Sequence, residues 1–184
     1  LLNGNLFKGL CTNHNNRRAG RVDKANLSEA LDRCENFGDI FELVKRAVKQ
    51  ALGQERIGLM LYLGNLPLSV GAFHQVGSNG IVMNRKLLNL VMASARSVRE
   101  LNAYVFSILL HEYLHSLGYL NEGEVRKLVY EISEGSLGAD HPATNIALHG
   151  PMRRLPIHGI PNNEEIGDFE IVKDFERSNQ NYIR

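Results

Sequence analysis

The sequence predicts an α+β fold, a compact domain in which a small sheet packs against a buried helix. Segments with a helical spacing of apolar residues flank residues 56–84, where short apolar runs separated by turn signals indicate strands. Residues 97–117 contain no Gly or Pro and are apolar almost all round the helical wheel, which is typical of a helix buried in a core. At 184 residues, the chain has the length of one such domain with flanking segments.

The first elements are a short arm and two helices. Residues 1–25 are rich in Asn, Gly and Arg without periodicity, so we expect an irregular arm there. Residues 26–37 (NLSEALDRCENF) read as a short helix with Asn26 or Ser28 as its N-cap. Residues 38–53 (GDIFELVKRAVKQALG) carry apolar side chains at helical spacing and end at Gly53, which predicts a second, amphipathic helix.

The middle of the chain supplies the strands and the buried helix. Residues 56–67 (RIGLMLYLGNLP) predict a buried strand, and residues 70–84 predict two shorter strands around the turn at 77–80. Gly118 is a suitable end for the buried helix because glycine adopts positive φ without strain. A further helix is expected over 122–136, followed after Gly138 by a loop or a short helical turn. The tail from residue 150 onward holds three of the five prolines, and we expect it to pack on the surface of the domain.

The composition excludes several classes of protein. The chain is 43% hydrophobic and 22% charged with a formal net charge of +1, so neither a nucleic-acid partner nor an anionic membrane is expected. Cys11 and Cys34 are too few for a disulfide scaffold and lack metal-type spacing, which favours reduced thiols in a cytoplasmic protein. No run has the length of a signal peptide's apolar core at the start or of a membrane span anywhere.

The chemistry of the chain is concentrated in LLHEYLHSLGY, residues 109–119. On a helix, His111 and His115 are one turn apart and project from the same face, where two imidazoles can bind one Zn²⁺. Glu112 points roughly 100° away from His111 but stays within reach of the water that such an ion activates, so it is the candidate catalytic base. Three unpaired polar side chains on an otherwise apolar helix would be costly, which favours a metal site over an accident of sequence.

The His-Glu-x-x-His pattern resembles the motif of the zincin superfamily of metallopeptidases. In that superfamily a small sheet precedes the active-site helix, and its edge strand pairs with an extended peptide; here the predicted strands of 56–84 occupy that place. The resemblance covers about residues 38–145 and implies a zincin-like catalytic domain over 26–149. It implies a zinc-dependent metallopeptidase acting on a peptide or protein, without indicating a subfamily.

A zinc site of this class needs a third protein ligand, and the sequence leaves several candidates open. In the metzincin branch of the superfamily, Gly118 matches the motif, but the ligand position is occupied by Asn121, a weak zinc ligand. In the gluzincin branch, a glutamate on the following helix is the ligand. Glutamates of the 122–136 helix are therefore candidates.

The direction of each glutamate on that helix ranks them. The apolar stripe consists of Val125, Leu128, Val129 and Ile132. Relative to it, Glu134 lies nearly opposite, Glu131 is about 110° from the centre, and Glu122 and Glu124 are at about 70° and 90°. If a ligand must face inward, none of these positions is comfortable, although Glu122 and Glu124 stay possible.

His141, in the loop GADHPATN (138–145), is the favoured third ligand at this point. The helix before it could return the loop to the metal, and Asp140 could orient its imidazole. The alternative interpretation of His141 is a helix-capping or loop histidine. Tyr113 and Tyr119 are candidates for stabilising an oxyanion, with core packing as the alternative. His74, between the predicted strands, is either part of the cleft or a half-exposed strand residue.

Two other functions remain open from the sequence. LHSLGY also resembles part of the motif of a zinc endoribonuclease family, in which a glycine would stand at Glu112 and an Asp-His pair would directly follow Tyr119. The near-neutral charge of the chain gives little help in binding phosphates. A zincin-fold binding module without turnover is the third interpretation.

Overall fold

The structure is a computed structural model that describes residues 24–151 and 167–176. In these two ranges it has an α+β fold, which confirms the predicted class. The helices are α1 (Lys24–Asp32), α2 (Phe37–Leu52), α3 (Arg85–Ser94), α4 (Val98–Ser116), α5 (Glu122–Leu137) and α6 (Pro142–His149). The strands are β1 (Met60–Asn65), β2 (Ala72–His74), β3 (Gly80–Asn84) and β4 (Gly167–Ile171).

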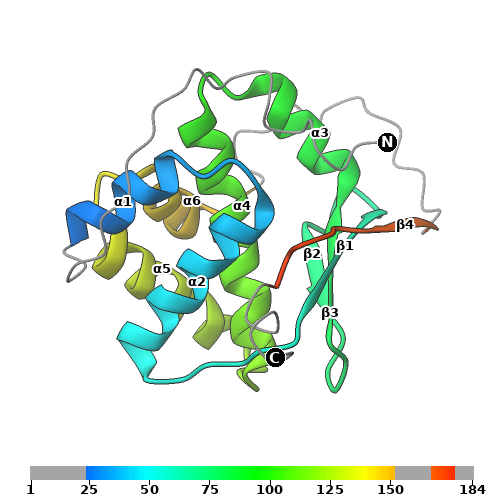
Figure 1. Ribbon diagram of the computed structural model, residues 1–184, viewed down its shortest axis with the longest axis horizontal. Coiled ribbons are helices and arrows are strands. Elements are labelled where there is room, and N and C mark those ends of the chain that lie inside the picture. The colour runs from blue at the N-terminus through cyan, green and yellow to red at the C-terminus, as the bar shows by residue number, and fades with distance from the viewer. Residues whose placement is uncertain (1–23, 152–166, 177–184) are drawn as a thin grey trace, which may run out of the picture.

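The four described strands form one mixed sheet in the order β2-β3-β1-β4 (Figure 1). β1 and β3 are parallel, whereas β2 and β4 are antiparallel to their neighbours. Side chains alternate across the sheet: Leu61, Leu63, Ile81 and Met83 are buried on the side of the helices. The other face is partly exposed, so β1 is buried on one face and not on both.

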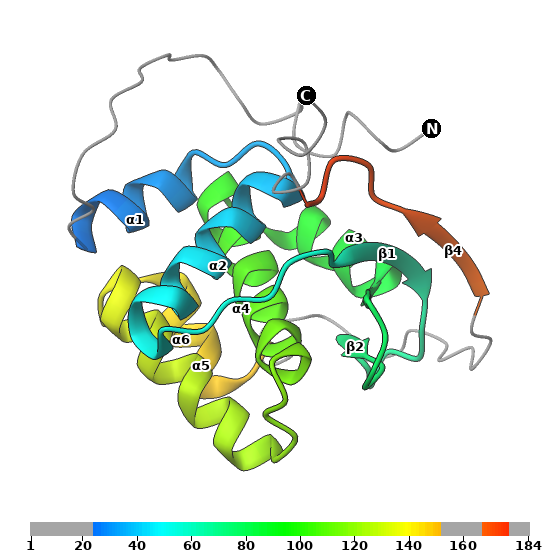
Figure 2. The ribbon, with the colours of Figure 1, turned by 60° about the horizontal axis from the view of Figure 1, so that its bottom comes forward.

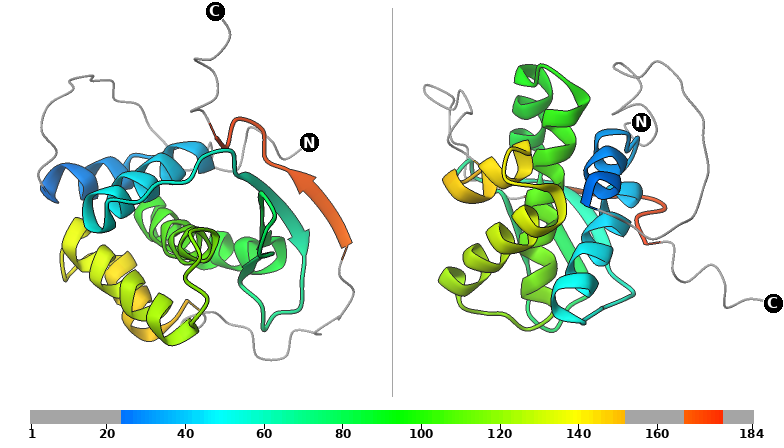
Figure 3. Two further views of the ribbon diagram at one scale, coloured as in Figure 1. Left: turned by 90° about the horizontal axis from the view of Figure 1, so that it is seen from below. Right: turned by 90° about the vertical axis from the view of Figure 1, so that its left-hand side faces the viewer.

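Helix α4 is the centre of the domain. The left panel of Figure 3 looks almost along its axis and shows the sheet on one side, α1 and α2 on another, and α5 and α6 on a third. All residues from Leu101 to Leu110 are buried, which explains why this stretch is apolar on every side. The helix begins at the N-cap Ser97, whose side chain accepts from the backbone N–H of Glu100. The predicted packing of a small sheet on a buried helix is confirmed.

The boundaries of α2 follow local chemistry. Its N-cap is Asn36, whose side chain accepts from the backbone N–H of Asp39, and its C-cap Gly53 has φ of 69°. The cap at Asn36 also divides the residues predicted as one short helix, because α1 ends at Asp32 and α2 begins at Phe37.

Other segments differ from the prediction. Residues 85–94 form α3, where no element is predicted, and the helical turn given as the alternative to a loop is part of α6. Residues 167–171, in the predicted tail, pair with β1 as an edge strand. The rest of the predicted arm and tail, residues 1–23, 152–166 and 177–184, lies outside the described residues. Cys34 is buried, and its thiol donates a hydrogen bond to the carbonyl of Ala30, whereas Cys11 is outside the described ranges. None of the described helices is long and apolar enough to cross a membrane.

Candidate metal centre

His111 and His115 lie on the last two turns of α4 and project from the same face, as their spacing predicts. Their Nε2 atoms are 3.1 Å apart, and the planes of the two rings are inclined at 69°. The side chains are 25% and 15% exposed, respectively, so the pair marks the point where a buried helix reaches solvent. Two imidazole nitrogens are therefore presented together at the edge of the core.

The corner between α4 and α5 brings Glu122 to this pair. Gly118 has φ of +101°, a left-handed conformation that lets the chain turn sharply after α4. Asn121 then caps the first turn of α5, which makes Glu122 the first residue of that helix. Figure 2 shows the last turns of α4 next to the start of α5 across this short connection. The Oε1 atom of Glu122 is 3.1 Å from Nε2 of His115, and its Oε2 atom is 3.4 Å from Nε2 of His111.

The tautomer of His115 is fixed by the same corner. Its Nδ1 lies 2.8 Å from the backbone carbonyl of Tyr119, which can only accept a hydrogen bond, so Nδ1 carries the proton. In the neutral ring, Nε2 then presents a lone pair toward the carboxylate of Glu122. Two such acceptors 3.1 Å apart repel unless a positive charge lies between them, either a proton or a cation. The corner is thus built to direct a nitrogen lone pair at the group.

The three side chains fit a metal ion. Ligand atoms that each lie about 2.0–2.1 Å from one tetrahedral Zn²⁺ are about 3.3 Å from one another. The separations in the group are 3.1, 3.1 and 3.4 Å. Glu122 is 59% exposed, so the side away from the protein is open to a water or a substrate. Within the described ranges, His111, His115 and Glu122 form the one group of three such side chains that could hold a metal ion.

Glu112 is held between the helix and the sheet. Its side chain is 5% exposed and accepts a hydrogen bond from the backbone N–H of His74 in β2. Burial, with a smaller contribution from the charge of Glu122, raises the pKa of Glu112 to about 8. A carboxyl group with a pKa near neutrality is suited to taking up and releasing protons, which is the property that a general base requires.

His141 does not belong to the group, so its prediction as third ligand needs correction. It is the N-cap of α6, where its Nδ1 accepts from the backbone N–H of Ala143 at 3.1 Å. Its Nε2 faces the carboxylate of Asp32 at 3.3 Å, and its side chain is 1% exposed. Both ring nitrogens therefore have partners far from His111 and His115, and burial lowers the pKa of His141. Asp140, the predicted orienting carboxylate, is exposed and is replaced in that role by Asp32.

The remaining candidates for a third ligand have other positions. Asn121 uses its side-chain oxygen to accept from the backbone N–H of Glu124, which is exposed. Glu131 pairs with Lys127 at 3.7 Å, and Glu134 accepts from the hydroxyl of Tyr130. Of the glutamates weighed from the sequence, only Glu122 meets the histidines.

Tyr113 has a structural role. Its hydroxyl accepts from the backbone N–H of Arg56 at 2.7 Å and donates to the carbonyl of the same residue, while its ring is fully buried. The side chain is thereby committed to the core and to the segment before β1, away from the two histidines. Tyr119 packs partly buried against the core, and its contribution to the site is the carbonyl that fixes His115.

A cleft of about 870 Å³ lies beside the metal group. Its walls are the loop before β2, the face of α4 that carries the motif, the first turns of α5, and the end of α6. The lining residues include Ser69, Ala72, Ile108, His111, Glu112, Glu122, Arg126, Lys127, Val129, Tyr130, Ile146 and His149. A substrate in this cleft would contact the metal group and the candidate base at once. His74 is not among the lining residues; its backbone N–H, which the sequence could not assign, is its link to the site.

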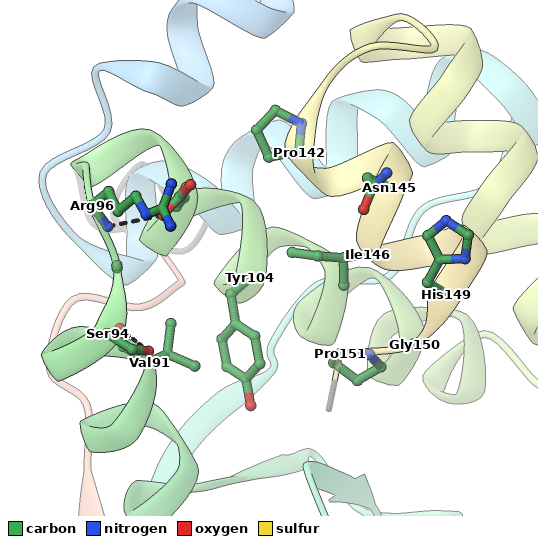
Figure 4. A pocket seen from close by; sticks show the side chains of 12 residues that line it. Val91, Ser94, Arg96, Tyr104, Pro142, Asn145, Ile146, His149, Gly150 and Pro151 are labelled. Atoms are coloured by element: carbon green, nitrogen blue, oxygen red, sulfur yellow. Dashed lines mark hydrogen bonds between the residues drawn. The ribbon is translucent and has the colours of Figure 1, made fainter. Parts of the chain in front are cut away.

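A second cavity of about 650 Å³ adjoins the cleft at the end of α6 (Figure 4). Ile146, His149, Gly150 and Pro151 line both. In Figure 4 the ring of Tyr104 extends from α4 and lies between Ser94 and Val91 on one side and Pro151 on the other. The face of α4 that carries His111 therefore borders hollow space over several turns.

Comparison with known proteins found no relative: no protein-family model matches the chain, and neither a curated protein nor a solved structure is significantly similar to it.

Proposed function

We propose that this protein is a zinc-dependent metallopeptidase in which His111, His115 and Glu122 hold the ion and Glu112 is the general base. The observation that carries the proposal is the convergence of two imidazole nitrogens and one carboxylate at 3.1–3.4 Å beside a buried glutamate on the same helix. A set of two histidines and one glutamate with an open position is a catalytic zinc set in hydrolases. A ligand glutamate on the helix after the motif is also the arrangement that the resemblance to gluzincins implies.

The chain's residues divide the hydrolytic chemistry between them. When bound, a zinc ion would polarise the scissile carbonyl and make water a better nucleophile at neutral pH. Glu112 takes the proton from the attacking water and gives it to the leaving amine. The backbone N–H of His74 orients that carboxylate, and the carbonyl of Tyr119 holds His115 in the tautomer that leaves Nε2 free for the ion.

The edge of the sheet supports a peptide as the substrate. Among the described strands, β2 pairs only with β3, so no described strand occupies its other edge. Gly71 directs its carbonyl inward to the N–H of Asn84, whereas His74 directs its N–H outward to Glu112. Because backbone groups alternate along a strand, those of Ala72 also point outward, and Ala72 lines the cleft. An extended peptide could add to this edge and place a carbonyl beside the metal group.

The test combines metal content with turnover. Glu112→Gln keeps the shape of the side chain, including an oxygen for the N–H of His74, but removes the base. We expect the variant to retain one zinc per chain and to lose peptidase activity by about 10²–10⁴-fold on a broad peptide library. Glu124→Gln, an exposed change on α5 outside the cleft, is the matched control and should retain full activity.

The same assay separates the alternatives. A structured RNA is offered in parallel with the peptides. Cleavage of RNA alone would contradict the peptidase and favour the endoribonuclease-like hydrolase. Failure of the zinc-loaded protein to cleave either substrate would contradict the proposal and favour a binding module.

A further inference from the structure

The carboxylate, arginine and lysine side chains that line the cleft all come from α4 and α5. Two of its lining residues are acidic, Glu112 and Glu122, and both have roles in the chemistry proposed above. Arg126 and Lys127, from the first turns of α5, also line it, and no other described lining residue carries a carboxylate. The strand side and the α6 side of the cleft therefore contribute no acid to balance these two cations. A bound zinc ion would add further positive charge.

Arg126 lies next to the metal group. It follows Glu122 by one helical turn, and its Nε is 3.9 Å from the Oε2 of that carboxylate. Its side chain is 76% exposed, and so long a separation at such exposure makes a weak pair. If Glu122 binds a metal ion, the ion neutralises part of the charge of its carboxylate, which weakens the attraction to Arg126. The guanidinium can then form two parallel hydrogen bonds with another carboxylate.

Lys127 extends the positive charge along the cleft. Its Nζ is 3.7 Å from Glu131, and the two side chains are 74% and 52% exposed, so this pair is also weak. The apolar residues Ile108, Val129 and Ile146 line the same cleft and could receive the aliphatic part of a side chain. The combination suits a short acidic side chain, with its methylene groups against the apolar wall and its carboxylate at the cations.

On the basis of the proposed function, we propose that the cleft selects peptides with a carboxylate close to the scissile bond, and that Arg126 and Lys127 are the residues that determine this specificity. The carboxylate is that of an Asp or Glu side chain or that of the peptide's C-terminus. Since Arg126 adjoins a metal ligand, the carboxylate would lie within one or two residues of the bond that is cut.

The experiment compares cleavage of matched peptides that differ at one residue. Each position beside the scissile bond is Glu, Gln or Lys in turn, and each peptide is made with a free and an amidated C-terminus. We expect kcat/KM to be about tenfold higher for the carboxylate-bearing peptide than for its Gln counterpart, and the preference to shrink in high salt. A preference that survives amidation assigns the carboxylate to the side chain; one that disappears assigns it to the C-terminus.

Charge-reversal variants give the decisive test of the proposed specificity. Lys127→Glu and Arg126→Glu should abolish the preference for Glu over Gln and raise cleavage of the Lys peptide. Lys173→Glu, which changes the net charge equally at an exposed residue outside the cleft, should leave the preference intact. Zinc content is measured for each variant, because Arg126 adjoins Glu122, whereas Lys127 contacts none of the three ligands.

The outcomes distinguish the two proposals. The proposed specificity is wrong if the unaltered protein cleaves the Glu, Gln and Lys peptides equally well. It is also wrong if Lys127→Glu and Arg126→Glu keep the original preference. Neither result contradicts the proposed peptidase activity. If the zinc-loaded protein cleaves no peptide, the proposed function fails, and this inference fails with it.

Discussion

Histidines from the neighbouring helices lie near both ends of α5, and their surroundings are opposite in kind. At its beginning, Glu122 meets His111 and His115, whose side chains are partly exposed and whose Nε2 atoms converge at 3.1 Å. Beyond its end, His141 is 1% exposed and uses Nδ1 to cap α6 and Nε2 to face Asp32. In the first environment, nitrogen lone pairs and a carboxylate converge at the solvent. In the second, one nitrogen of His141 accepts a hydrogen bond and the other faces a carboxylate to which it can donate. A ligand histidine therefore needs a ring nitrogen whose lone pair is directed at other ligand atoms, and burial alone does not identify it.

The hydrogen bond of His115 to Tyr119 sharpens this contrast. That bond makes Nδ1 the donor, so in the neutral ring Nε2 presents a lone pair to Glu122 and His111. At His141, Nδ1 instead accepts from the backbone N–H of Ala143, so Nε2 carries the proton and donates it to Asp32. A histidine whose Nδ1 donates a hydrogen bond keeps the Nε2 lone pair for a metal ion, whereas one whose Nδ1 accepts and whose Nε2 donates does not.

The largest expected effect is on zinc affinity. His111→Ala and Glu122→Ala each remove a direct ligand. Loss of an outer-shell partner lowers metal affinity by about 10–100-fold, and we expect zinc affinity to fall by more than that in these two variants. His141→Ala should leave affinity unchanged. Competition against a zinc chelator measures all three. Loss of affinity in His141→Ala alone would reverse the comparison and restore the ligand set predicted from sequence.

A smaller effect is expected on the free energy of unfolding, where His141→Ala should now matter more than His111→Ala. In metal-free protein, His141→Ala removes a buried N-cap and leaves Ala143 N–H unpaired, and should lower the free energy of unfolding by about 1–3 kcal/mol. His141→Asn should recover part of the loss, because asparagine is a good N-cap. His111→Ala should change stability less, because that side chain is partly exposed and its removal leaves no buried backbone N–H unpaired. Urea unfolding of the three variants measures the difference, and equal losses for His111→Ala and His141→Ala would contradict it.

The smallest effect concerns the response to acid. Burial lowers the pKa of His141 below the ordinary 6.5, against the opposing influence of Asp32 and with a minor contribution from Arg99. Below pH 6.5 the unfolded chain then binds a proton that the folded protein does not, so stability falls as pH drops toward the folded pKa. His141→Asn should lose less stability than the unaltered protein between pH 7 and pH 5.5. Parallel slopes in that interval would show that His141 does not contribute.

The main helices and the motif were predictable because their signals are local. Helix α4 is apolar on every face, as a central helix must be, and its limits follow from Ser97 and Gly118. The convergence of His111 and His115 follows from helical geometry alone. Helix α3 also had a local signal that was passed over, since Leu87, Leu88 and Val91 are buried at helical spacing after the N-cap Asn84.

Glu122 was ranked too low for a physical reason. The angular ranking measures direction from the apolar stripe of α5, which assumes that the ligand and the stripe face the same way. The stripe packs into the core, but as the first residue of α5, Glu122 reaches back across the turn at Gly118 to the end of α4. The useful indication of a ligand was that Glu122 directly follows the N-cap Asn121 after the turn at Gly118, and not its angle on the helical wheel.

The other errors arise from contacts between distant parts of the chain. β4 has few apolar residues, and its place in the sheet depends on pairing with β1, about a hundred residues earlier. The role of His141 depends on Asp32 in α1, although Pro142 at the first position of α6 was a local indication of a helix start. Likewise, the hydrogen bond from His74 to Glu112 involves a backbone group, which side-chain identity does not reveal.

Anomalous scattering at the zinc edge from a crystal of the purified protein tests the central claim most directly, because it locates the ion together with its ligands. We predict one strong peak about 2.0–2.1 Å from Nε2 of His111, Nε2 of His115 and a carboxylate oxygen of Glu122, and no peak at His141. A peak bound by His141, or full zinc occupancy at a place that none of the three residues contacts, would contradict this account.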